Sequence, residues 1–308
     1  MQRPLRAIAL SLVAGVALAG CATSDPTDNS GGGEPAGDGQ IVVGSNAFPE
    51  AEILAEIYAQ ALEDAGYEVE RNLSIGTRQQ TFAALEDGGI TLQPEYAGNL
   101  LTYLDEDATE TSEDEIADAL DAALEGTGIQ AYDFAPAQDQ DAYVVTSEYA
   151  EANGLESIAD LEGVQPFTLG ANPEFAELSY GLPGLADAYG ISDVEFSQYT
   201  DFGGPDTVQA LLDGTIDVAD IYTTSPAIAE NDLVVLEDPE QIIAAQNIVP
   251  VIADSVATDE IAEILNAVSA ALTTEDLIAL RTRVEGSEAA SPAVAAADWL
   301  VEQGLIEG

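Results

Sequence analysis

Short apolar runs alternate with amphipathic stretches from residue 41 onward. The run 41–43 predicts a short buried strand, and 48–65, with its apolar residues on one face, predicts an amphipathic helix. A strand over 69–75, a helix over 79–87 and a strand over 90–93 are expected to follow. This alternation is typical of a parallel sheet with right-handed crossover connections.

One pattern occurs twice in the chain, with its copies 126 positions apart. The first copy contains Ala84, Leu85, Asp87, Gly88, Ile90 and Tyr96, and the second contains Ala210, Leu211, Asp213, Gly214, Ile216 and Tyr222. The same shift carries Gly44 and Asn46 onto Gly170 and Asn172. We therefore expect two similar α/β lobes, each with a strand that ends near a tyrosine.

The second lobe should repeat the order of the first. Its predicted elements are a strand at 167–169, a helix near 182–189, a strand at 194–196, a helix at 207–212 and a strand at 216–219. After residue 236, a strand near 248–252 and three helical stretches are expected to complete the first lobe. The predicted domains are therefore 40–140 with 233–308 for the first lobe and 141–232 for the second, joined by a double-crossover hinge.

The first twenty residues have the layout of a secretory signal peptide. Arg3 and Arg6 precede an apolar stretch that is too short to span a bilayer. Cys21, the only cysteine, follows directly and resembles the lipidated cysteine of a bacterial lipobox. Residues 21–39, rich in Gly, Ser, Asp and Pro, predict a flexible tether. We expect an extracytoplasmic protein, lipid-anchored to the outer face of the bacterial cytoplasmic membrane; an ordinary signal peptide with an incidental cysteine is the alternative.

The charge of the chain is extremely negative. It has 58 acidic residues, no lysine and no histidine, and a formal net charge of −52. Beyond the signal peptide, its only basic residues are Arg71, Arg78, Arg281 and Arg283. A nucleic-acid partner is excluded because phosphate binding needs a basic surface. Most of the acids are interpreted as a solvating surface, and a salty or alkaline habitat is our hypothesis for their number.

The same composition weakens every enzymatic interpretation. Without histidine, and with the only thiol assigned to lipidation, Ser-His-Asp, Cys-His and His-based zinc chemistry are unavailable. The acidic run 105–115 has Glu110 where an EF-hand loop needs glycine, so calcium is not expected there. We predict no catalytic residues, no metal and no cofactor.

Aromatic residues gather at the predicted strand ends, where ligands bind in sheets of this kind. They are Phe48, Tyr96, Tyr199, Phe202 and Tyr222, with Tyr143 near the first crossover. Each ring attracts a cation that lies within about 6 Å, by about 2 kcal/mol or more when the pair is desolvated. A quaternary ammonium suits such a cage because it has no N–H to donate. Packing is the alternative for each tyrosine, but Tyr96 and Tyr222, related by the repeat, should open on the same cleft.

Several motifs together resemble one family. They are Gly-Ser-Asn-Ala-Phe-Pro-Glu at 44–50, Gly-Thr-Arg at 76–78, Pro-Glu-Tyr-Ala-Gly at 94–98, Tyr-Gly-Leu-Pro-Gly-Leu at 180–185 and Gly-Gly-Pro-Asp-Thr at 203–207. They are similar to segments of the glycine betaine/carnitine/choline-binding proteins of osmoprotectant ABC importers. The resemblance implies a two-lobed periplasmic-binding-protein fold of type II that delivers its solute to a membrane permease driven by an ATPase. By position, it makes Tyr96, Tyr143, Tyr199 and Tyr222 the cage.

The chain also departs from this family. Many members hold the substrate carboxylate with a lysine and an arginine, at places that Asn46 and Leu178 occupy here. The other candidate ligand-binding residues are Phe48, Arg78, Asn99 and Asn172. Arg78 could instead form a salt bridge, so choline, which has no carboxylate, competes with glycine betaine as the expected solute. We expect a monomer; a lipid-anchored sensor or adhesin that serves no permease, or a binder of another small cationic or zwitterionic solute, stays open.

Overall fold

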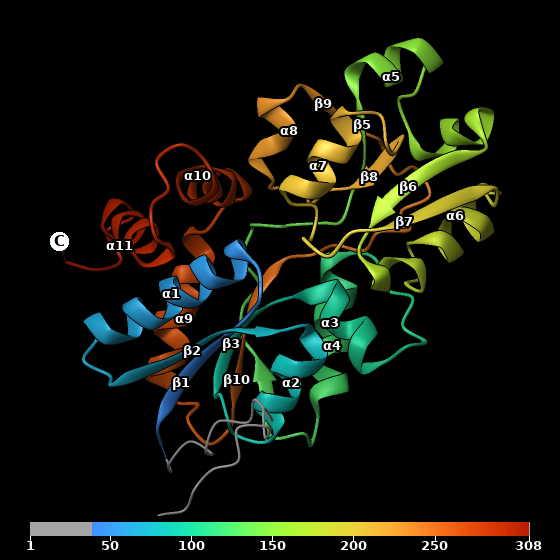
Figure 1. The fold of residues 1–308 in the computed structure, drawn as a ribbon. Coiled ribbons are helices and arrows are strands. Elements are labelled where there is room, and N and C mark those ends of the chain that lie inside the picture. The colour runs from blue at the N-terminus through green and yellow to red at the C-terminus, as the bar shows by residue number, and fades with distance from the viewer. Residues whose placement is uncertain (1–38, 308) are drawn as a thin grey trace, which may run out of the picture. The chain divides into compact units, whose positions relative to one another are not determined.

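The computed structural model describes residues 39–307, which form two lobes, each built on a five-stranded sheet (Figure 1). The predicted signal peptide, Cys21 and nearly all of the predicted tether lie outside the described residues. The first sheet has the order β2 (Val69–Gly76), β1 (Ile41–Asn46), β3 (Leu92–Tyr96), β10 (Ile248–Ala253) and β4 (Ile129–Ala131). The second has the order β7 (Val194–Gln198), β6 (Phe167–Ala171), β8 (Val218–Asp220), β5 (Tyr143–Thr146) and β9 (Leu233–Val235).

Helices surround both sheets. The first lobe has α1 (Pro49–Asp64), α2 (Arg78–Glu86), α3 (Ala97–Leu104), α4 (Glu113–Leu124), α9 (Asp259–Ala271), α10 (Thr274–Glu285) and α11 (Pro292–Glu302). The second has α5 (Ser147–Asn153), α6 (Leu182–Tyr189), α7 (Pro205–Leu212), α8 (Pro226–Glu230) and the 3₁₀ turns Ile158–Val164 and Pro173–Ala176. Every helix between residues 39 and 307 is too short or too polar to span a lipid bilayer.

Helix α1 is the most deeply buried helix of the first lobe. Pro49 stands at its first turn, where a missing N–H costs nothing. Ile53, Leu54 and Ile57 are fully buried, and the helix packs against both the first sheet and α9, α10 and α11. Residues of β10 and of these three helices complete the core of the first lobe, to which the sequence analysis assigns the C-terminal segment.

Each sheet combines the predicted parallel strands with strands that run the opposite way. In the first, β1 is parallel to β2 and β3, whereas β10 is antiparallel to β3 and β4. In the second, β6 is parallel to β7 and β8, whereas β5 is antiparallel to β8 and β9. The prediction of purely parallel sheets is therefore wrong, because both sheets are mixed. The antiparallel strands β5 and β10 are the ones that enter each sheet from the other lobe.

Two crossovers join the lobes, as the sequence predicts, and they meet in a bridge between Gln138 and Asn247. The second crossover begins later than expected. Strand β9 pairs with β5, so the second lobe continues past residue 232. We use "first lobe" for residues 39–138 and 247–307 and "second lobe" for residues 141–237.

The 126-residue repeat is visible in the strand register. Val43 pairs with Leu92 in the first sheet, and the positions 126 later, Leu169 and Val218, pair in the second. The repeated glycines have the same packing reason. A Cβ on Gly44 would lie 2.5 Å from the Ile90 side chain, and one on Gly170 would lie 2.4 Å from Ile216. Each isoleucine therefore fills the space that its glycine leaves.

Candidate functional site

A cavity of about 690 Å³ opens between the lobes, and residues of both lobes line it. From the first lobe come the ends of β1 and β3 and the start of α2, and from the second come the segments that follow β6 and β8. This is the edge where the carboxyl ends of the parallel strands meet, which is the usual ligand position in such sheets.

Four aromatic rings form one cluster in this cavity. The ring centroid of Phe48 lies 6.0 Å from that of Tyr96, 5.9 Å from that of Phe202 and 6.1 Å from that of Tyr222. Phe48 and Tyr96 belong to the first lobe, and Phe202 and Tyr222 belong to the second. A cation among these rings would face aromatic surfaces of both lobes at once.

Seven of the nine predicted ligand-binding residues line the cavity. They are Asn46, Phe48, Arg78, Tyr96, Asn99, Asn172 and Tyr222. Some of their polar atoms are already engaged. The Oδ1 of Asn46 accepts a hydrogen bond from Thr81 at 2.8 Å, and the Oδ1 of Asn172 accepts one from the Phe202 amide at 3.3 Å. The amide nitrogens of Asn46 and Asn172 donate to no partner among the described residues, so both can face a ligand.

Tyr143 and Tyr199 are placed elsewhere, which corrects their assignment to the cage. Tyr143 is fully buried in the core of the second lobe against Phe175, and its hydroxyl donates to the Tyr180 carbonyl oxygen at 2.8 Å. Tyr199 packs beside Gly170, with Val208 and Ile216 in its hydrophobic cluster. Neither side chain lines the cavity.

Phe202 belongs to the ring cluster, although the sequence indicates only an aromatic residue near a strand end and does not predict it as a ligand-binding residue. Its backbone has a φ of 55°, a left-handed conformation that is uncommon for a bulky residue. Gly203 follows with a φ of 69° and packs closely on the backbone of residues 220–222. This turn places the Phe202 ring beside Phe48, and no signal in the sequence predicted such a backbone.

Three carboxylates form an acidic wall of the cavity. Asp139 and Asp141 come from the first crossover and the start of the second lobe, and Asp220 ends β8. Asp141 accepts a hydrogen bond from the Tyr180 hydroxyl at 3.0 Å. Asp220 is 1% exposed, and its Oδ1 has no hydrogen-bond partner among the described residues. Burial, and then the charge of Asp141, raise the pKa of Asp220 well above its usual range.

The pKa of Asp141 is also raised, chiefly by burial. Two such neighbouring carboxyl groups oppose each other's ionisation, which adds to the effect of burial on both pKa values. Asp141 and Asp220, hereafter the acid pair, therefore present both a hydrogen-bond acceptor and partial negative charge to a ligand.

Arg78 is the only arginine that lines the cavity within the described residues. Its Nε donates to the buried carboxylate of Glu95 at 3.0 Å, so the salt bridge expected as an alternative is present. The two terminal nitrogens of its guanidinium make no hydrogen bond among residues 39–307. Arg78 can therefore keep its partner and still donate to a ligand carboxylate.

Asn99 is less available than expected. Its Oδ1 accepts a hydrogen bond from Gln246 at 3.0 Å, and its backbone N–H donates to the same glutamine side chain at 2.9 Å. The Nδ2 lies 3.5 Å from Asp141 Oδ2. The side chain thus mainly connects the acid pair to the second crossover.

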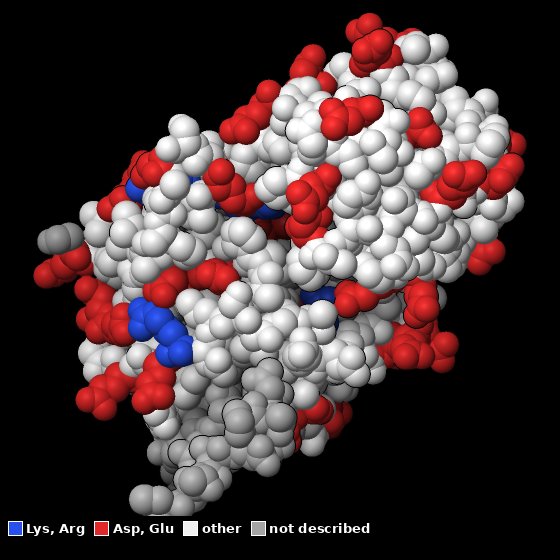
Figure 2. All heavy atoms as spheres, viewed as in Figure 1, with Lys and Arg blue, Asp and Glu red and all other residues white. Residues whose placement is uncertain are grey.

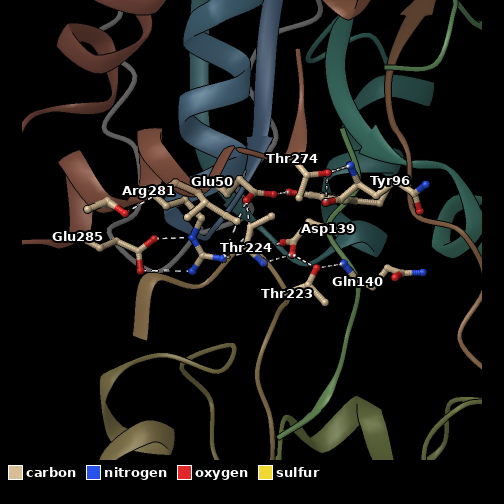
Figure 3. A network of polar contacts seen from close by, with 12 residues as sticks. Glu50, Tyr96, Asp139, Gln140, Thr223, Thr224, Thr274, Arg281 and Glu285 are labelled. Carbon is tan, nitrogen blue, oxygen red and sulfur yellow. Dashed lines mark hydrogen bonds and ion pairs between the residues drawn. The ribbon is translucent and has the colours of Figure 1, made fainter. Parts of the chain in front are cut away.

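Glu50 was not predicted as a site residue, although it ends the first motif. It is 1% exposed, and its Oε1 accepts a hydrogen bond from the Tyr96 hydroxyl at 2.8 Å (Figure 3). Burial, with the nearby charge of Asp139, raises the pKa of Glu50 to about 8, although Arg281 opposes the rise. Tyr96 is therefore held by its hydroxyl as well as by packing.

The outer surface carries the acidic excess. On the face shown in Figure 2, Asp and Glu are spread over both lobes, and basic atoms show at only a few points. Such a surface attracts cations over long distances and repels anions, more weakly as salt is added.

Comparisons with known proteins agree with this geometry. The family model for the substrate-binding domain of ABC-type glycine betaine transport systems matches residues 39–302, so the chain belongs to this family. The glycine betaine-binding protein YehZ of Escherichia coli K12 is 29% identical over 281 residues, which cover 86% of this chain and 90% of YehZ. A glycine betaine-binding protein of Pseudomonas aeruginosa PAO1 is 26% identical over 287 residues, with 86% of this chain and 88% of its own covered.

A solved structure shares the fold. The crystal structure of a glycine betaine/carnitine/choline ABC transporter protein superposes with a TM-score of 0.73, covering 87% of this chain and all of its own at 20% identity. The predicted family and two-lobed α/β fold are thus confirmed. The chain is an extracytoplasmic solute-binding component of an ABC importer rather than an enzyme, and a permease with its ATPase is the partner that this class serves.

Proposed function

We propose that the cleft binds a quaternary ammonium solute and holds its methylated ammonium group among the rings of Phe48, Tyr96, Phe202 and Tyr222. The observation that carries this proposal is the contact of Phe48 with the three other rings at about 6 Å. Aromatic faces stabilise a diffuse positive charge when water is excluded. Two rings come from each lobe, so the cage is complete only when both lobes contribute.

Glycine betaine is the first candidate solute. Its carboxylate needs hydrogen-bond donors near the cage, and the two unengaged nitrogens of Arg78 are such donors. The amide nitrogens of Asn46 and Asn172 add two more. The named relatives of Escherichia coli and Pseudomonas aeruginosa are glycine betaine-binding proteins, which supports the same choice.

Choline is the second candidate, and the acid pair favours it. The Oδ1 of Asp220, which has no hydrogen-bond partner among the described residues, can accept a hydrogen bond from a hydroxyl group, which choline has and glycine betaine lacks. Choline also carries a net positive charge, which the acidic wall and the acidic surface attract. The two candidates therefore use different residues at the end opposite the ammonium.

Isothermal titration tests the proposal. We expect the wild-type protein to bind glycine betaine, choline or both. If choline is a ligand, its uncharged isostere 3,3-dimethylbutan-1-ol should bind at least about tenfold more weakly than choline, because the isostere has no charge for the rings to attract. Carnitine, proline betaine and ectoine complete the panel. Absence of binding by every quaternary ammonium compound at millimolar concentration would refute the proposal.

We further infer that the protein is a monomer anchored by lipid on Cys21 to the outer face of the cytoplasmic membrane. The support is the signal-like layout of residues 1–20 and the single cysteine that follows them. Detergent phase partitioning of the native protein and of Cys21→Ser tests the anchor, since only the native form should enter the detergent phase. Solute uptake by a deletion strain separates an importer component from a sensor or adhesin.

A further inference from the structure

Thr224 of the second lobe reaches into a buried polar cluster of the first lobe (Figure 3). Its hydroxyl lies 2.5 Å from Oε2 of Glu50 in α1 and 2.9 Å from Nη1 of Arg281 in α10. All three residues are at most 5% exposed. Helix α10 also packs against α8, the helix that follows Thr224 in the chain. A contact between the lobes is thus built from buried polar groups.

The Thr224 hydroxyl can accept one hydrogen bond and donate another. Arginine can only donate, so the Thr224 oxygen accepts from Arg281, and the ionised form of Glu50 accepts the hydrogen of the hydroxyl. The second oxygen of Glu50 accepts from the Tyr96 hydroxyl at 2.8 Å. Glu50 therefore receives one hydrogen bond from a ring of the proposed cage and another from the opposite lobe.

The charged groups around this cluster increase the free-energy cost of losing the Thr224 hydroxyl. Arg281 lies 3.9 Å from Glu50, 4.0 Å from Asp139 and 2.6 Å from Glu285. The Thr224 amide also donates to Asp139 at 3.0 Å, which brings the loop close to the first crossover. If the lobes separated, Glu50 and Arg281 would lose the hydroxyl that connects them, and a buried polar group without its partner is costly.

The same short loop carries a ring of the cage. Tyr222 lies two residues before Thr224, and Tyr96 is bound directly to Glu50. A solute between Tyr96 and Tyr222 and the contact between Glu50 and Thr224 therefore join the same two segments. An interaction that brings Tyr96 and Tyr222 closer together therefore also brings Glu50 and Thr224 closer together, and the reverse also holds.

We propose that Glu50, Thr224 and Arg281 form an interlobe latch that positions Tyr96 and Tyr222 and makes closure of the lobes part of the affinity for solute. The link to affinity rests on the proposed function, because it requires that the two rings contact the solute. The latch itself does not, since it concerns how the lobes meet. These residues are positioning residues, because none of the three lines the cavity.

The substitution Thr224→Val tests the latch while nearly conserving the volume of the side chain. We expect binding of the best solute to weaken about fivefold to tenfold, mainly through a faster off-rate, because about one net hydrogen bond is lost. Thr223→Val is the matched control. Its hydroxyl accepts from the Gln140 amide at 3.0 Å and donates to Asp139 at 3.2 Å, so it bonds to the crossover but not to Glu50 or Arg281. It should change affinity less than twofold.

A double-mutant cycle with Tyr96→Phe, which keeps the ring but removes its hydroxyl, tests whether the latch acts through Glu50. If it does, the two substitutions together weaken binding less than the product of their separate effects. Independent effects would contradict the role of Glu50. A loss of melting temperature in Thr224→Val with unchanged affinity and off-rate would also overturn the latch, because it would show a purely structural role.

A measurement without solute separates this inference from the proposed function. Small-angle scattering of the unliganded protein should give a larger radius of gyration for Thr224→Val than for wild type, because the latch favours approach of the lobes. Equal radii for the two proteins would overturn the latch whether or not any solute binds. Absence of solute binding with a larger radius for Thr224→Val would instead refute the proposed function and leave the latch supported.

Discussion

The two copies of the internal repeat have the same scaffold and different loops. Strand register, the close approach of glycine to isoleucine and the position of a tyrosine after the third strand agree between them. At the cleft, however, Phe48 corresponds to Glu174, Glu50 to Ala176 and Arg78 to Gly204. The core thus kept its pattern while the loops at the strand ends diverged, which is where binding residues are expected to change.

The two matched tyrosines illustrate this difference. Tyr96 is 5% exposed, and Glu50 accepts a hydrogen bond from its hydroxyl. The hydroxyl of Tyr222 makes no hydrogen bond among the described residues, and its side chain is only partly buried. One ring is fixed to its own lobe, and the other is presented on a loop that the latch connects to the first lobe.

The lobes also differ in charge. The second lobe has no lysine, arginine or histidine, whereas all four arginines beyond the first twenty residues belong to the first lobe. A zwitterionic solute should therefore direct its carboxylate toward Arg78 in the first lobe. A monocation has no such requirement and can direct its hydroxyl toward the acid pair.

Truncation of the two tyrosines should have the largest effect on solute binding. The two variants should differ in stability, although the repeat relates the two positions. Tyr96→Ala and Tyr222→Ala should each weaken binding roughly tenfold or more, because each removes a cation–π contact. Only Tyr96→Ala should also lower stability markedly, by about 3 kcal/mol, because it empties a core site and leaves Oε1 of Glu50 without its donor. Titration calorimetry and denaturant unfolding measure the two effects. Unchanged isotherms for both variants would remove the cage.

Substitution of the charged residues opposite the aromatic cage should have the second-largest effect on solute binding. Arg78→Gln is expected to weaken glycine betaine binding by about tenfold and to leave choline nearly unaffected, because only the carboxylate needs the guanidinium. Asp220→Asn should weaken choline and spare glycine betaine. Competition titrations with both solutes give the two ratios. If both variants weaken both solutes equally, the proposed division of the cleft is wrong.

The pH dependence should be smaller and have a definite sign. Burial raises the pKa values of Asp141 and Asp220. Burial also raises the pKa of Glu50 to about 8. The charged and polar neighbours of Glu50 are Asp139, Arg281, Tyr96 and Thr224. A bound cation favours the ionised carboxylates, so binding releases protons. Choline affinity should therefore rise roughly severalfold with pH over the range in which these carboxyl groups ionise, which includes pH 8 for Glu50. Calorimetry that shows constant affinity from pH 6 to pH 9 would exclude this linkage.

The ionisation of Glu50 affects stability in the opposite sense. Its pKa in the folded protein lies above its ordinary value of 4.5, so its contribution to stability is fully present below pH 4.5 and is lost as the pH rises to about 8. Glu50→Gln should remove this part of the pH dependence. The free energy of unfolding, followed from about pH 4 to about pH 9 in both proteins, is the measurement.

Salt should have the smallest effect on the site but a measurable one on the fold. Mutual repulsion among the acids is screened by salt, so the unfolding midpoint should rise from low to molar salt. The association rate of choline should fall by about twofold to threefold over the same range, whereas that of neutral glycine betaine should change little. Stopped-flow fluorescence of both solutes tests this difference. No gain in stability at high salt would argue against a saline habitat.

Much of the fold could be predicted because its signals are local or periodic. The apolar runs and the repeat predicted the strands, the two lobes and the return of the C-terminal segment. The boundary near residue 232 was placed too early because β9 is only three residues long and pairs with β5, far away in the sequence. A pattern of apolar residues does not show which sheet such a strand joins.

The candidate site was predicted less completely, for physical reasons. The apolar run that contains Tyr143 is buried on both faces, so the sequence could not show that its ring points into the core of the second lobe. Phe202 depends on a left-handed backbone conformation. The contact of Glu50 with Thr224 joins residues 174 positions apart, and only the folded chain brings them together.

The position of a bound ammonium group tests the cage most directly. A crystal structure of the protein with glycine betaine or choline should place the quaternary nitrogen within about 6 Å of ring centroids from both lobes, with Tyr96 and Tyr222 among them. A nitrogen that contacts the rings of one lobe only, or that lies outside the cluster around Phe48, would contradict a cage built from both copies of the repeat.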